Sequence, residues 1–139
     1  MPWHDIGVMV HGAAARDVAR HFIQRWNAVK DEKAKKINQY PYLIPKSYEY
    51  FEGPKQFSPD SQYKVKCQVL RSISAWSGGF LDPDMWEESI HEAYITSITK
   101  SQHYIYIENQ FFISLARQNP FVKNQIGEAL CKRIMKAHK

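Results

Sequence analysis

A run of helix- and strand-breaking residues divides this chain. Within 19 positions it carries Pro41, Pro45, Gly53, Pro54 and Pro59. Proline has no backbone N–H and a fixed φ, so this density excludes a regular helix or a central strand there. The same stretch is rich in tyrosine, which a free linker would not need. We therefore predict that residues 31–63 form a packed, irregular connection between residues 1–30 and residues 64–139.

The first part predicts one strand and one amphipathic helix. Residues 3–10 end in an apolar run typical of a strand, and His11-Gly12 breaks it. From Ala13 to about Lys30 the apolar residues recur at helical spacing and fall on one stripe. The members of this stripe are Val18, Ala19, Phe22, Ile23, Trp26 and Val29.

The second part predicts alternating strands and helices. Residues 64–70 and 104–107 show the two-residue alternation of strands. A helix capped by Asp84 or Ser89 runs between them to about Lys100, and a last helix starts at Asn119-Pro120. If the first of these helices is a crossover, the two strands are parallel. This alternation of strands and helices predicts an α/β fold.

Composition narrows the possible partners. The chain has 139 residues and a formal charge of +5, which favours acidic partners such as nucleic acid or an anionic membrane. Cys67 and Cys131 lie far apart without metal-ligand spacing, and we expect them to be reduced core residues of a cytosolic protein. No apolar run is long enough to span a membrane, so membrane contact would be peripheral.

Polar residues follow the second predicted strand directly. Glu108, Asn109 and Gln110 come between Ile107 and two phenylalanines. Strand ends that place polar groups beside apolar ones are common positions for substrate-holding residues in α/β enzymes. The alternative is a strand followed by a polar turn, with Glu108 paired to a structural arginine.

Five stretches match, in the same order, the sequences of one enzyme family. They are residues 2–6, 15–27, 40–47, 68–72 and 105–112. The chain thereby resembles eukaryotic phospholipase D, and within it the animal-type, phosphoinositide-regulated branch. This resemblance implies a partial phospholipase D fold. Residues 1–30 would end the first catalytic lobe, residues 31–63 would connect the lobes, and residues 64–139 would begin the second lobe.

The family's catalytic motif is missing from this sequence. The reaction needs two copies of His-x-Lys-x-x-x-x-Asp, and none of the six histidines here has lysine two positions on. The chain resembles the stretch between the two motifs, so we expect it to be inactive alone. The resemblance implies a parent enzyme that hydrolyses phosphatidylcholine to phosphatidic acid and choline through a phosphohistidine, without metal or cofactor. In it, Glu108, Asn109 and Gln110 would support the pocket.

Two arginines form a candidate anion site. Arg16 and Arg20 are one helical turn apart, so both guanidinium groups can reach one anion, and Lys30 would lie near the same face. The alternative is a solvated helix face. The resemblance implies that Arg16 and Arg20 bind phosphatidylinositol bisphosphate, an activator of the parent enzyme. His91, on the polar flank of its helix, is expected to be exposed.

Three functions follow from these observations. The first is part of a phospholipase D that works at cytosolic membrane leaflets containing phosphatidylcholine and anionic lipids. The resemblance adds small GTPases and protein kinase C as partners of the parent. The second is a non-catalytic module that binds anionic lipids such as phosphoinositides. The third, a nucleic-acid binder, lacks any recognisable reading motif, so we expect no nucleic acid among the partners.

Overall fold

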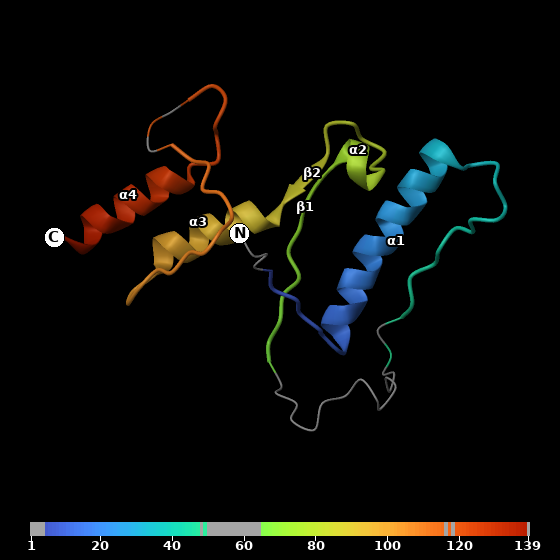
Figure 1. Ribbon diagram of the computed structural model, residues 1–139, viewed down its shortest axis with the longest axis horizontal. Coiled ribbons are helices and arrows are strands. Elements are labelled where there is room, and N and C mark those ends of the chain that lie inside the picture. Colours follow the sequence, from blue (N-terminus) through green and yellow to red (C-terminus); the bar gives the residue numbers. More distant parts are fainter. Residues whose placement is uncertain (1–4, 48, 50–64, 116, 118, 139) are drawn as a thin grey trace. The chain divides into compact units, whose positions relative to one another are not determined.

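The computed structural model describes residues 5–47, 49, 65–115, 117 and 119–138 (Figure 1). The elements in chain order are α1 (Ala13–Lys33), β1 (Ser72–Ser74), α2 (Ala75–Gly78), β2 (Trp86–Glu88), α3 (Ser89–Lys100) and α4 (Ile126–Ala137). β1 and β2 form a two-stranded sheet. Helices with a small sheet confirm the predicted α/β class.

The chain separates into two compact units. In their described parts, the first consists of residues 5–47, 49, 65–69 and 73–85, and the second of residues 70–72, 86–115, 117 and 119–138. In the first unit α1 packs against α2, and in the second α3 packs against α4. The predicted boundaries at residues 30 and 63 are not tested by this division and stay predictions.

Helix α1 confirms the helix predicted from residue 13 and extends it to Lys33. Gly12 precedes it with a φ of 81°, a conformation that glycine adopts without steric cost. At the other end, the Lys30 side chain donates hydrogen bonds to the carbonyls of Ala34 and Ile37, at 3.1 and 3.0 Å. Both carbonyls belong to the turn that follows α1, so the Lys30 ammonium ties that turn to the last part of the helix, where the macrodipole favours a cation.

Side chains of α1 hold the beginning of the proline-rich connection. Asn27 makes two hydrogen bonds of 2.9 Å with the backbone of Leu43, one to its carbonyl and one from its N–H. The Trp26 indole donates to the carbonyl of Pro41 at 2.9 Å, and the Tyr42 hydroxyl donates to Asp31 at 2.6 Å. These hydrogen bonds fix the backbone at residues 41–43, but most side chains from 31 to 47 are exposed, so the packed connection stays a prediction. Residues 48 and 50–63 lie outside the described residues.

Three predicted strands differ from the structure. Residues 5–10, 65–70 and 104–107 have no strand conformation, while the sheet forms at 72–74 and 86–88; residues 3, 4 and 64 lie outside the described part. Alternation marks a segment that suits a strand, but the strand exists only when a neighbour pairs with its backbone groups. No paired strand lies beside residues 104–107 within the described ranges, and Tyr104 is 84% exposed.

Helix α3 runs from Ser89 to Lys100 as expected, but the capping residues predicted for it and the start predicted for α4 were wrong. The Ser89 hydroxyl binds the backbone of Arg71 instead of capping α3, and Asp84 lies in the turn before β2. The side chain of Asn119 accepts from the N–H groups of Phe121 and Val122, which closes a turn and starts no helix. Helix α4 begins only at Ile126, whose N–H donates to the Asn124 side chain at 3.2 Å.

Candidate functional site

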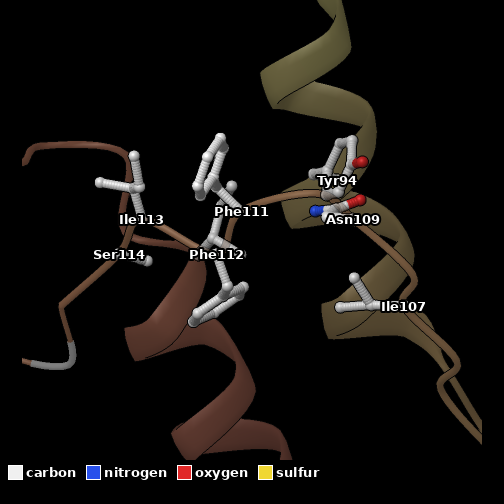
Figure 2. Close-up of a pocket in the computed structure, with 8 residues that line it drawn as sticks. Tyr94, Ile107, Asn109, Phe111, Phe112, Ile113 and Ser114 are labelled. Atoms are coloured by element: carbon white, nitrogen blue, oxygen red, sulfur yellow. The ribbon is translucent and has the colours of Figure 1, made fainter. Parts of the chain in front are cut away.

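A pocket of about 290 Å³ lies in the second unit, beside the predicted polar triplet. Helix α3 contributes Tyr94 and α4 contributes Ile126. The segment between these helices supplies the rest of the wall, namely Ile107, Asn109, Phe111, Phe112, Ile113 and Ser114 (Figure 2). An apolar pocket with few polar groups is typical of a site that binds an apolar molecule with a polar end.

The three residues of the polar triplet have different environments in the structure. Asn109 lines the pocket, where its amide can both donate and accept hydrogen bonds. Glu108 accepts a hydrogen bond of 2.6 Å from the Tyr106 hydroxyl. Gln110 is exposed and does not line this pocket. Neighbouring side chains on an extended backbone point in different directions, so adjacency in sequence did not bring all three together.

The bond between Tyr106 and Glu108 has an electrostatic consequence. Because the neutral phenol donates to the carboxylate, this hydrogen bond raises the pKa of Tyr106 above 10.0, with desolvation as a second cause. The stabilisation is present below the phenol's ordinary pKa and is lost as pH rises through the raised value. At neutral pH the Tyr106 phenol is therefore protonated and donates to the Glu108 carboxylate.

Sequence reasoning missed the aromatic and helical parts of the pocket wall. Phe111 and Phe112 directly follow the polar triplet, so the sequence alone could have suggested that they line the same site. Tyr94 and Ile126 left no such signal, because only the packing of α3 against α4 brings them to the segment. The pocket is thus formed by tertiary contacts around a polar triplet that is visible in the sequence alone.

The arginine pair lies on α1, in the other unit. Arg16 and Arg20 are half-buried, and an Nη of Arg20 donates to the carbonyl of Lys46 at 3.1 Å. Lys30 does not belong to this candidate surface. Its side chain is buried, binds two carbonyls and lies 4.8 Å from the centre of the Tyr42 ring. A lysine held in this way stabilises the end of α1.

His91 is not the exposed residue that its helical position predicted. Its side chain is 33% exposed, and its Nε2 lies 2.5 Å from the carbonyl oxygen of Asn124. Its Nδ1 lies 3.7 Å from a carboxylate oxygen of Glu88. The imidazole therefore joins α3 to the segment that precedes α4, a contact between residues 33 positions apart that no local pattern reveals.

Comparison with known proteins identifies the family. The sequence profile described as Phospholipase D matches residues 1–126, and the chain belongs to the phospholipase D family. Over its whole length it is 52% identical to Phospholipase D1 of Homo sapiens and 51% identical to Phospholipase D2 of Bos taurus, over 140 residues each. Phospholipase D1 of Schizosaccharomyces pombe is 44% identical over 146 residues.

The matched region is a small share of these relatives. The chain spans 13% of the human protein, 14% of the bovine protein and 10% of the fission-yeast protein. The predicted resemblance to eukaryotic, animal-type phospholipase D is confirmed by these identities. Among the described residues, no helix combines the length and apolar character needed to cross a membrane.

Proposed function

We propose that this chain is the part of a phosphatidylcholine-hydrolysing phospholipase D that lies between its two His-x-Lys-x-x-x-x-Asp motifs. The observation that carries the proposal is the identity of 52% along the whole chain, combined with the absence of that motif from all 139 residues. The chain supplies pocket wall and scaffold, and it has no activity alone. The reactive imidazoles come from the flanking lobes of the parent enzyme.

Each residue of the polar triplet has a role in this proposal. Glu108 orients a catalytic imidazole and favours its protonated form, as an acid does in other nucleophile-base sites. Asn109 donates to a phosphate or headgroup oxygen, which is supported by its position in the lining of the pocket. Gln110, which is exposed here, contacts the headgroup from outside this pocket. One motif histidine attacks the phosphodiester phosphorus while the other protonates the oxygen of the leaving choline. Water, giving its proton to that second histidine, then cleaves the phosphohistidine and releases phosphatidic acid.

The proposed membrane and regulatory partners are those of the parent phospholipase D. The enzyme acts at cytosolic leaflets that contain phosphatidylcholine and anionic lipid, as a peripheral protein. It is activated by phosphatidylinositol bisphosphate and regulated by small GTPases and protein kinase C. No metal takes part in the phosphohistidine step.

A chimera tests the proposal. The 140 matched residues of the human protein are replaced by this chain, and choline release from phosphatidylcholine is measured for the chimera and for the isolated chain. We expect release by the chimera and none by the chain alone. Glu108→Gln in the chimera should lower the rate by about tenfold or more, because it removes the charge that orients the imidazole.

Two results would contradict this function. One is turnover by the isolated chain. The other is a chimera that melts cooperatively like the human enzyme but releases no choline. The melting measurement separates loss of the fold from loss of chemistry.

The second candidate function is phosphoinositide binding through Arg16 and Arg20. It is supported by their spacing of one turn on an observed helix. Exchanging both for glutamine should lower binding to vesicles containing phosphatidylinositol bisphosphate by about thirtyfold, since each lost cation near an anionic surface costs about 1 kcal/mol. Lys132→Gln with Lys136→Gln on α4 removes the same charge and should have a smaller effect. Equal losses in the two double variants, with unchanged helical circular dichroism, would refute a specific site.

A further inference from the structure

The segment between α3 and α4 forms a loop with a closed neck. The Asn124 amide donates to the carbonyl of Ile113 at 2.7 Å, and the Ser114 hydroxyl donates to the Asn124 side-chain oxygen at 2.7 Å. The Ser114 oxygen also accepts from the N–H of Gly127 at 2.6 Å. Ends held together around a short excursion define an Ω-loop. It is the orange loop before α4 in Figure 1, and we call its described residues, Leu115, Arg117 and 119–123, the tip loop.

Two further contacts fix the shape of the loop. His91 of α3 binds the carbonyl of Asn124, which ties the neck to the helix. At the far end, Asn119 accepts hydrogen bonds of 2.8 and 3.1 Å from the N–H groups of Phe121 and Val122. The described residues 119–124 are thus held by side-chain hydrogen bonds, so binding through them requires less ordering of the chain.

The tip loop displays an apolar side chain to solvent. Phe121 is 91% exposed although the turn at Asn119 holds its backbone. Leaving a phenylalanine side chain in water forgoes the free energy that its burial would contribute. Phe121 is therefore available for contact with another surface.

The charge around this side chain indicates the partner. From Asn109 to Gly127 the sequence contains no aspartate or glutamate, whereas Arg117 and Lys123 both lie in the tip loop. Aromatic side chains flanked by cations match the boundary of an anionic bilayer, where the rings enter the interface and the cations meet lipid phosphates. A protein partner would not require the absence of acids over 19 residues.

We propose that the tip loop is a membrane-insertion element. Phe121 enters the interface of a bilayer, and Arg117 and Lys123 contact anionic headgroups. The inference rests on the proposed function in one respect, since it assumes that the chain acts at a membrane surface. The inference names the residues that contact the membrane, and these differ from Arg16 and Arg20 on α1.

The test measures binding of the full 139-residue chain to phosphatidylcholine vesicles with and without phosphatidylserine, in the absence of phosphoinositide. Phe121→Ser should weaken partitioning by about tenfold, as expected for partial loss of one phenylalanine burial. Phe121→Trp should preserve binding, because tryptophan suits the interface. Arg117→Gln with Lys123→Gln should remove most of the gain that phosphatidylserine gives.

Leu81→Ser is the matched control. Leu81 is fully exposed in the other unit, at 104%, so its loss tests non-specific adhesion of apolar side chains. We expect this variant to bind like the unaltered chain. The inference is overturned if Phe121→Ser binds normally, if Leu81→Ser loses as much, or if the unaltered chain does not partition at all. Choline release by the chimera is a separate readout, so failure of the proposed function remains distinguishable from failure of this loop.

Discussion

Replacing Gly79 with alanine is expected to destabilise the first unit by about 3 kcal/mol, from two separate causes. Gly79 has a φ of 65°, and a side chain in the left-handed region costs about 1–2 kcal/mol. An added Cβ would also lie 2.8 Å from the Cβ of Ala28 on α1. Overpacking of this kind typically costs 1–3 kcal/mol, roughly, because one of the two elements must move.

Gly12 provides a comparison that lacks the steric clash. It has a φ of 81° and a ψ of -146°, and a Cβ there would meet nothing within 4 Å. Gly12→Ala should therefore show only a backbone cost, about 1–3 kcal/mol for a conformation that is essentially restricted to glycine. Hydrogen exchange of the α1 amides and thermal unfolding measure both variants. Adding Ala28→Gly to Gly79→Ala should recover the steric part, less about 1 kcal/mol for glycine within a helix. No recovery in the double variant would show that the close approach to Ala28 is absent.

Replacing Ile98 with alanine should be the most damaging change in the second unit. Within the described ranges only Ile73 and Ile98 are buried apolar side chains, and Ile98 is 3% exposed on α3. Removing a buried isoleucine side chain down to Cβ costs about 2–5 kcal/mol, from lost transfer free energy and from the cavity left behind. A unit with so few buried side chains has little else to compensate.

Ile90 on the same helix serves as the comparison. It is 38% exposed, so Ile90→Ala should cost less than about 1 kcal/mol. Exchange rates of the α3 and α4 amides report both substitutions in one experiment. If the two variants exchange alike, Ile98 is not the residue that holds α3 against α4.

Helix prediction succeeded where the information was local. The stripe from Val18 to Val29 and the apolar residues before Lys100 predicted α1 and α3, because side chains three and four positions apart share a helix face. The same stripe did not predict burial, since Val18 and Phe22 remain 48% and 57% exposed in this chain. Periodicity indicates which face can be buried, and only a packed partner buries it.

Prediction failed where two distant segments had to meet. Residues 104–107 alternate as a strand does, yet the sheet forms between 72–74 and 86–88. Asn119-Pro120 looked like a helix start, but Asn124 and Ser114 supply the acceptors that begin α4 at Ile126. In both cases the deciding hydrogen bonds are made by groups whose positions depend on the rest of the fold.

By itself the sequence determined the membership of this chain in its enzyme family, the absence of His-x-Lys-x-x-x-x-Asp from its 139 residues, and a polar triplet placed beside aromatic residues. Those properties follow from the order of the residues alone. The tertiary structure alone decided that Asn109 faces a pocket, that Glu108 binds Tyr106, and that Lys30 is enclosed by carbonyls and a ring. Side-chain direction, burial and partner choice depend on three-dimensional packing, which a local pattern does not specify.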